Sequence, residues 1–216
     1  PPTTVLLDME PPIAWTRWGL REAVAPPRSK SARAQQLLRY TPMLGHSTGA
    51  SHRALASSLK RAGWRVDVVA PPMLSFGSRW QRWLGTSIEG LSDRAFEPMA
   101  YTSLFEGYSY GLVDRRVARD LLARLARRSS AVSLGVVGGG ALGDERPYRD
   151  VSELVDDIAI CRASGVERLS LYALDGMLAR GPIEPWLDAF VQTQPGVMPG
   201  RTRRGTLFEA LAGALG

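Results

Sequence analysis

The feature that most constrains the fold of this chain is a regular alternation of strand-like and helix-like segments. Strands that alternate with helices are typical of a parallel sheet whose faces are covered by helices. The expected strands are 5–10, 65–70, 98–104, 132–137 and 168–174, and the expected helices are 51–62, 78–84, a helix after Asp114, 150–164 and 183–192. The sequence therefore predicts an α/β fold with five strand–helix units.

Local signals mark where several of these helices begin and end. Asp114 is of the residue type that caps helix N-termini, and Asp150 with Glu153 has the spacing of a capping box. Gly63 and Gly165 follow the last apolar residues of their helical patterns, where glycine commonly ends a helix. These signals support the expected boundaries.

Length and composition are those of a globular protein. The chain has 216 residues, of which 44% are hydrophobic, so it can bury a sizeable core. We expect a barrel-like domain over 1–193, with an inserted basic loop over about 26–48 and a Pro-, Gly- and Arg-rich tail over 194–216. The chain opens on Pro1 without a methionine, which predicts a piece of a longer protein and leaves the compartment undetermined.

Few residues are available to bind metals. Cys161 is the only cysteine, and His46 and His52 are the only histidines. This excludes an internal disulfide, a zinc site made of cysteines and a histidine-rich metal site. We expect no metal and no cofactor.

The positive charge of the chain is concentrated in two places. The formal net charge is +6, and no zinc-finger, RNP or helix-turn-helix signature accompanies it. A solvated helix face and a basic tail account for it, so we expect no nucleic-acid partner. No apolar run is long enough for a membrane span. The arginines concerned are Arg115, Arg116, Arg119, Arg124, Arg127 and Arg128, and in the tail Arg201, Arg203 and Arg204.

Two carboxylates end the first expected strand. Asp8 and Glu10 are two residues apart, so on a strand their side chains share one face. Like charges at that range raise one carboxyl pKa, and a general acid needs a raised pKa near neutral pH. An ordinary strand that ends at a solvated rim is the alternative interpretation.

Two glycine-containing motifs resemble known loops of enzymes. The segment 45–49 fits the nucleophile elbow of α/β-hydrolases, but no histidine follows His52 to act as the base, which excludes that chemistry. Gly138, Gly139 and Gly140 follow a strand and could present backbone N–H groups to a phosphate. About ten loop residues separate these glycines from the next helix, which disfavours a dinucleotide fingerprint.

Several aromatic residues are candidates for contacts with a sugar, because flat rings with polar edges stack on sugar rings as well as filling cores. Tyr101 and Tyr172 lie where expected strands run toward their carboxyl ends, and Asp175 follows the last strand. Trp15 and Trp80 are further candidates, although Trp80 also has the spacing of a packing residue.

Taken together, these segments resemble the C-terminal part of a TIM barrel of the chitinase-like glycoside hydrolases. That family has a D-x-x-D-x-D-x-E signature on its fourth strand, of which Asp8-Met9-Glu10 matches the last part; Thr3 and Leu6 replace the earlier aspartates. The sixth strand of the family reads M-x-Y-D, and here Met99-Ala100-Tyr101 is followed by Thr102. Tyr172 falls where the eighth strand usually carries an aromatic residue.

The resemblance implies a role for each matched residue. Glu10 would protonate the glycosidic oxygen, Asp8 would hold its proton, and Tyr101 would position the N-acetyl group of a polysaccharide substrate. It also implies that the first three units of a barrel precede Pro1. The alternatives are an open five-stranded parallel sheet of the flavodoxin type, a non-catalytic glycan-binding barrel, and a phosphate-ester enzyme that uses the loop 138–143.

Overall fold

The computed structural model describes residues 4–9, 49–86, 88, 96–109, 111–140 and 145–215. These residues form an α/β fold with parallel strands in small open sheets, and no closed barrel is present among them. The α/β prediction is confirmed, and the described strands fit the open-sheet alternative. The chain divides into two compact units, Pro1–Phe96 with Ala212–Gly216, and Glu97–Leu211.

The first unit contains a parallel strand pair and a helix that covers it. Its elements are β1 (Thr4–Asp8), α3 (Gly49–Arg61), β2 (Arg65–Ala70), a 3-10 turn η2 (Pro72–Phe76) and α4 (Ser78–Trp83). Val5 pairs with Val66 and Leu7 with Val68 in parallel register. Val66 and Val68 of β2 pack with Ala56 of α3 in an apolar cluster, so the hydrophobic pattern fixes this face of the strand pair.

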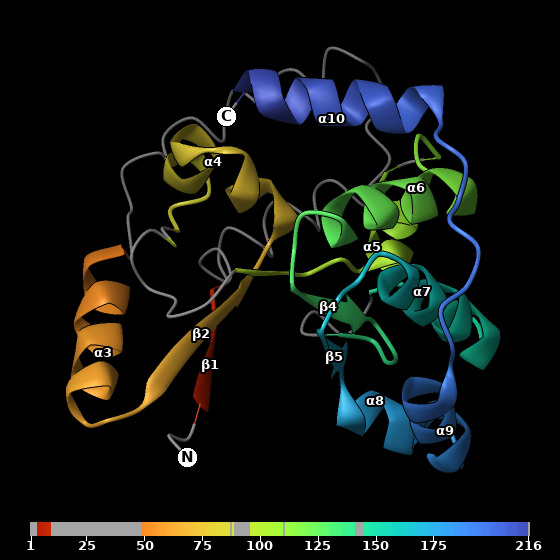
Figure 1. Ribbon diagram of the computed structural model, residues 1–216, viewed down its shortest axis with the longest axis horizontal. Helices are drawn as coiled ribbons and strands as arrows, with labels where there is room; N and C mark the ends of the chain where they lie inside the picture. The colour runs from red at the N-terminus through yellow and green to blue at the C-terminus, as the bar shows by residue number, and fades with distance from the viewer. Residues whose placement is uncertain are drawn as a thin grey trace. The chain divides into compact units, whose positions relative to one another are not determined.

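The second unit contains the other described strands and most of the helices (Figure 1). Its elements are β3 (Glu97–Pro98), α5 (Thr102–Tyr108), α6 (Arg115–Ala126), β4 (Ala131–Gly135), α7 (Val151–Ala163), β5 (Arg168–Tyr172), α8 (Leu174–Ala179), α9 (Glu184–Gln192) and α10 (Arg203–Leu215), whose last residues belong to the first unit. Strands β4 and β5 pair in parallel, with Ser133 opposite Ser170. Met99 forms a parallel bridge with Ser133, which aligns the segment after β3 with β4.

The helix starts expected from the sequence are confirmed. The Asp114 carboxylate accepts a hydrogen bond from the backbone N–H of Val117 (2.9 Å) and so caps α6. Asp150 accepts one from the N–H of Glu153 (3.3 Å), while the Glu153 carboxylate accepts one from the N–H of Arg149 (2.9 Å). These bonds satisfy backbone donors that have no partner within the first helical turn.

One face of the β4–β5 pair forms the core of the second unit. Val132, Leu134, Leu169 and Leu171 stand at every second position of their strands and pack against α6 and α7. Fully buried side chains from these helices, among them Leu122 of α6, complete the cluster. The opposite face of the two strands carries Ala131, Ser133 and Gly135 of β4 and Arg168, Ser170 and Tyr172 of β5.

Three segments differ from the sequence-based expectation. The strand expected over 98–104 is short, because α5 begins at Thr102 and the chain turns helical there. Helix α8 was not expected, since Gly176 lies inside it. The tail 194–216 contains a helix, α10.

Two glycines allow the backbone after β4 to touch α8. A Cβ added at Gly138 would lie 2.7 Å from the Cα of Gly176, and a Cβ added at Gly176 would lie 2.7 Å from the Cα of Gly138. Both neighbours are backbone atoms, which cannot rotate out of the way. The contact thus requires glycine on both sides.

We expect Gly176→Ala to lower the free energy of unfolding by about 1–3 kcal/mol, because the added methyl group overpacks a rigid contact. The shift of the urea midpoint measures this effect. Gly213→Ala is the matched control: nothing lies within 4 Å of its Cβ position in α10, so the protein should keep or slightly gain stability. Equal midpoints for Gly176→Ala and the unchanged chain would contradict the packing argument.

Candidate functional site

The face of the β4–β5 pair that does not pack against α6 and α7 carries most of the polar residues of the two strands. In parallel register Arg168 lies opposite Ala131, Ser170 opposite Ser133, and Tyr172 opposite Gly135, so these residues share one face. Parallel strands in the middle of α/β proteins are usually apolar on both faces. Two serines and an arginine in such strands therefore indicate a face adapted to contact something other than a hydrophobic core.

Two tyrosines stack at the carboxyl end of this face. The ring centroids of Tyr101 and Tyr172 are 5.9 Å apart, and their planes differ by 16°. Tyr101 is 8% exposed, and its hydroxyl lies 3.4 Å from the hydroxyl of Ser133. Tyr172 is partly exposed. The structure thus brings together two residues that the sequence placed on separate strands.

Gly135 makes room for this stack. A Cβ at Gly135 would lie 2.9 Å from the carbonyl oxygen of Tyr172 and 3.3 Å from two carbons of the Tyr101 ring. Ser103 fixes the start of α5 beside it, because its hydroxyl donates to the Gly135 carbonyl (3.1 Å) and accepts from the Val136 N–H (3.0 Å). The two hydrogen bonds of Ser103 therefore fix the backbone around Gly135, and the absence of a side chain at Gly135 leaves room for the two tyrosines.

Of the two carboxylates predicted at the end of the first strand, the structure describes Asp8. Asp8 ends β1 with an exposed side chain, and partial burial of its carboxyl raises its pKa above the ordinary 3.8. The direction is the one that the acid-pair interpretation expects, although burial rather than a second carboxylate is the cause. Asp67 of β2 shares this face of the strand pair and is 1% exposed. Glu10 and Trp15 lie outside the described residues.

Two other candidates occupy different surroundings. Trp80 of α4, in the first unit, is partly buried, and its indole N–H donates to the carbonyl of Ala212 (2.8 Å). This bond gives Trp80 a role in packing, which was the alternative considered from its spacing. Asp175 is exposed in the first turn of α8, three residues after Tyr172. Neither residue takes part in the tyrosine stack.

The glycine loop after β4 has a structural explanation at two of its three positions. Gly138 permits the close contact with Gly176, and Gly140 has a left-handed φ of +65°. A Cβ at Gly140 would also collide with the carboxylate of Glu145. A carboxylate beside the loop repels a phosphate, so this geometry does not favour the phosphate cradle.

Asp157 of α7 is fully buried in a cluster of hydrogen bonds that joins three helices. It accepts hydrogen bonds from Thr102, from the Tyr148 hydroxyl (3.0 Å) and from the Arg115 guanidinium (3.0 Å). Burial raises the pKa of Asp157 to about 6 against the opposing effect of these partners. Arg115 also donates to the Glu153 carbonyl (2.8 Å), so the cluster joins α5, α6 and α7. We assign it to helix packing.

Sequence reasoning missed the polar residues in the middle of the strands. Asp67, Ser133 and Ser170 were counted only as members of strand patterns. A usable signal was present in one strand, because polar residues alternate with leucines in R-L-S-L-Y, which contains Ser170. That alternation marks a strand with one polar face.

Among the described residues, no group of three His, Cys, Asp or Glu side chains could hold a metal ion. Burial raises the pKa of the Cys161 thiol, in agreement with a packed and unreactive cysteine. The helices described here include none that combines the length and the apolar character needed to cross a membrane.

Comparison with known proteins gives no further constraint on the site. No protein-family model, no curated protein and no solved structure matches the chain.

Proposed function

We propose that this chain is a glycoside hydrolase-like protein that acts on a polysaccharide through the carboxyl ends of its strands. The observation that carries the proposal is the stacked Tyr101–Tyr172 pair at the end of a polar sheet face. A partly exposed aromatic ring bordered by hydroxyl groups suits a sugar, which offers an apolar ring face and polar edges. Ligands of α/β proteins commonly bind at the carboxyl ends of the strands.

The polar face also supports a barrel-type fold as the wider arrangement. In a β-barrel, inward-facing residues alternate with outward-facing ones along every strand. Strand β5 has this alternation, with Leu169 and Leu171 in the helix-covered core and Ser170 on the other face. In the proposal, the polar face is the one that a barrel turns inward.

The chemistry of the proposal belongs to the acid pair of the first unit. Glu10 donates a proton to the glycosidic oxygen, and Asp8, whose pKa is raised, holds a proton next to it. For the second unit taken by itself, the proposal gives Tyr101 the role of contacting the N-acetyl group of a bound sugar. The Tyr101 hydroxyl is oriented by Ser133. The acid chemistry of the first unit and the sugar contact of the second unit can be tested separately.

The alternative function, glycan binding without turnover, is favoured by the departures from the family motif. Thr3, Leu6 and Thr102 stand where the family has aspartates, so three charges that support catalysis are missing. Under this alternative the tyrosine pair still binds sugar, and the acid pair has no catalytic role.

Binding of a chitin oligosaccharide tests the site in either case. We expect Tyr172→Ala to weaken binding about five- to tenfold, because it removes the stacking surface. Isothermal titration calorimetry measures the change in Kd. Tyr172→Phe retains the ring and should bind nearly as the unchanged chain does.

Trp64→Ala is the control for this experiment, since Trp64 is an aromatic residue of the first unit with 40% exposure and no place in the tyrosine stack. Its removal should leave Kd unchanged. If Tyr172→Ala binds as tightly as the unchanged chain, the proposed sugar site is wrong.

A further inference from the structure

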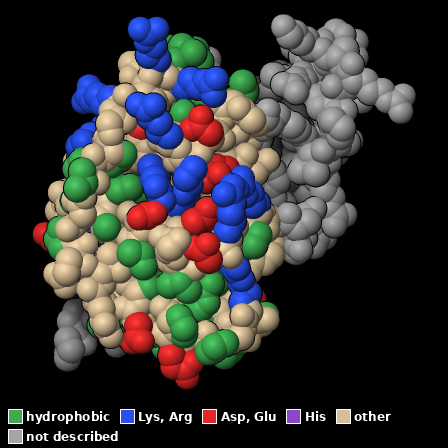
Figure 2. Space-filling model, turned by 90° about the vertical axis from the view of Figure 1, so that its right-hand side faces the viewer, with side chains coloured by type: hydrophobic (Ala, Val, Ile, Leu, Met, Phe, Trp, Pro, Cys, Tyr) green, Lys and Arg blue, Asp and Glu red, His purple; other side chains and the backbone are tan. Residues whose placement is uncertain are grey.

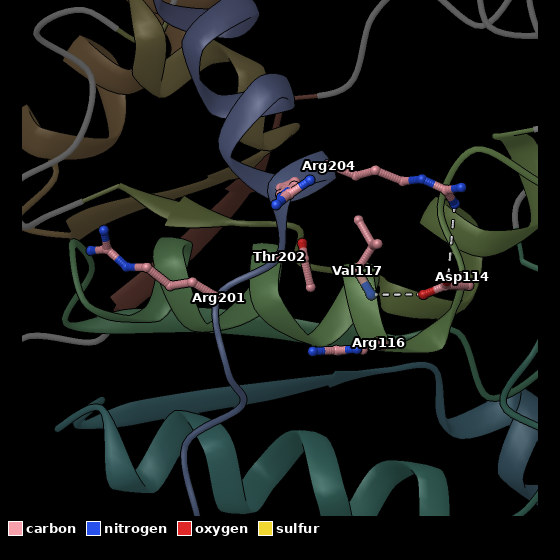
Figure 3. A pocket seen from close by; sticks show the side chains of 7 residues that line it. Asp114, Arg116, Val117, Arg201, Thr202 and Arg204 are labelled. Carbon is pink, nitrogen blue, oxygen red and sulfur yellow. Dashed lines mark hydrogen bonds and ion pairs between the residues drawn. The ribbon is translucent and has the colours of Figure 1, made fainter.

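A pocket of about 400 Å³ lies where the start of α6 meets the segment that leads into α10 (Figure 3). Four arginines line it, Arg116 from α6 and Arg201, Arg203 and Arg204 from the segment before and within α10. Figure 3 shows Arg201 and Arg204 on opposite sides of Thr202, with Arg116 on the helix below them. The pocket lies within the second unit and is separate from the tyrosine pair.

A buried carboxylate fixes the segment that carries three of these arginines. Asp120 of α6 is 1% exposed and accepts hydrogen bonds from both the backbone N–H (2.7 Å) and the hydroxyl (2.8 Å) of Thr202. The Thr202 hydroxyl in turn accepts from the N–H of Gly205 (2.9 Å), which caps α10. A Cβ at Gly205 would collide with the Asp120 carboxylate, so only glycine allows this close approach. The pocket is therefore held by buried contacts.

Ion pairs divide the arginines of α6, of the residues just after it and of the segment leading into α10 into two groups. Arg115, Arg119, Arg124 and Arg128 each have a carboxylate partner. In contrast, no described residue forms a hydrogen bond or an ion pair with the side chains of Arg116, Arg201 and Arg203. On the face shown in Figure 2, acidic side chains accompany the basic ones in the middle, and basic ones prevail at the upper end.

The pocket has an excess of positive charge. Its one acidic residue is Asp114, which lies 3.8 Å from Arg204, and both side chains are 60% exposed. Four positive charges and one negative charge leave a net charge of +3 on the lining residues. Like charges held together in this way repel one another, and a bound anion relieves that repulsion.

We propose that this pocket binds a small ligand that carries two or more phosphate groups. Guanidinium groups pair with phosphate oxygens through parallel hydrogen bonds, which is why arginine prevails in phosphate sites. None of the described lining residues is aromatic, which disfavours a single-stranded nucleic acid, because such ligands stack on rings.

Titration with tripolyphosphate at about 150 mM NaCl tests the proposal, because salt at that concentration screens diffuse surface attraction. We expect the unchanged chain to bind, and the double variant R116Q/R203Q to lose at least about tenfold in affinity. The control R53Q/R127Q removes two exposed arginines outside the pocket, from α3 and from the end of α6, and changes the net charge equally. It should bind within about twofold of the unchanged chain.

Three outcomes would overturn the proposal. These are an unchanged chain that does not bind tripolyphosphate, a control variant that loses as much affinity as the pocket variant, and a chain that binds a single-stranded oligonucleotide but not tripolyphosphate. Equal thermal unfolding midpoints for both double variants show that the arginines were removed without loss of the fold.

Discussion

Replacing Arg115 by alanine is expected to lower the free energy of unfolding by about 3–5 kcal/mol near pH 8. The guanidinium is 3.0 Å from the fully buried carboxylate of Asp157, and its own side chain is only 17% exposed. Without it, the buried carboxylate keeps only the more distant Arg119, whose Nε lies 4.0 Å away, and remains out of water. Uncompensated buried charges are among the few changes that destabilise a protein this strongly.

The loss should be smaller at lower pH. In the folded chain the pKa of Asp157 is about 6, above the ordinary 3.8, so the folded state binds the proton more tightly than the unfolded state does. The contribution of the Asp157 carboxyl to the free energy of unfolding is fully present below about pH 4 and is lost as the pH rises through 6. Removing Arg115 takes away the cation that favours the carboxylate, so the pKa rises further. Near pH 5 Asp157 is then protonated and needs no cation.

Urea unfolding of the variant and the unchanged chain at about pH 5 and pH 8 measures both effects. Arg116→Ala is the matched control, because this neighbouring arginine is exposed and has no partner among the described residues. It should change stability by no more than about 0.5 kcal/mol. Equal losses for Arg115→Ala at both pH values would show that the ion pair is not the cause.

Replacing Glu10 by glutamine should reduce the hydrolysis of chitin oligosaccharides by about a hundred- to ten-thousandfold. Proton donation by a positioned acid contributes an acceleration of that order, and the amide cannot supply the proton. The substitution keeps the size and shape of the side chain, so we expect an unchanged far-UV circular dichroism spectrum and an unchanged Kd for the oligosaccharide. The rate of reducing-end release measures the effect.

Glu184→Gln is the control for the rate measurement, since Glu184 is exposed at the start of α9. It should hydrolyse at the rate of the unchanged chain. If Glu10→Gln is as active as the unchanged chain, the acid assignment is wrong. If the unchanged chain binds the oligosaccharide without hydrolysing it, the protein is a glycan-binding relative.

Part of the candidate site was accessible from the sequence. Tyr101 and Tyr172 were singled out because each stands near the carboxyl end of an expected strand, and parallel strands bring those ends to the same edge. The serines beneath them were not singled out, because a serine in a strand gives no local sign of what lies opposite. The pairing of Ser133 with Ser170 depends on register between segments more than thirty residues apart.

The basic residues illustrate the same limit. The sequence showed a run of arginines on one helix and another in the tail, and a solvated surface was the natural interpretation. The structure separates arginines that neutralise buried or partly buried carboxylates from those that line a pocket. The Asp120–Arg124 pair has the local i,i+4 spacing within α6. The partners of Arg115 and Arg128 are instead set by the packing of α7 and α10 against α6, and no local pattern encodes them.

The sequence by itself determined the α/β class, the parallel strands of both units and the starts of α6 and α7. These follow from apolar periodicity and from caps such as Asp114 and Asp150, which act over three or four residues. Only the tertiary structure decided the tyrosine stack beside Gly135, the contact between Gly138 and Gly176, and the hydrogen bond from the Thr202 N–H to the Asp120 carboxylate. Each of these joins residues more than thirty positions apart, and their contact depends on how whole elements pack rather than on any local preference.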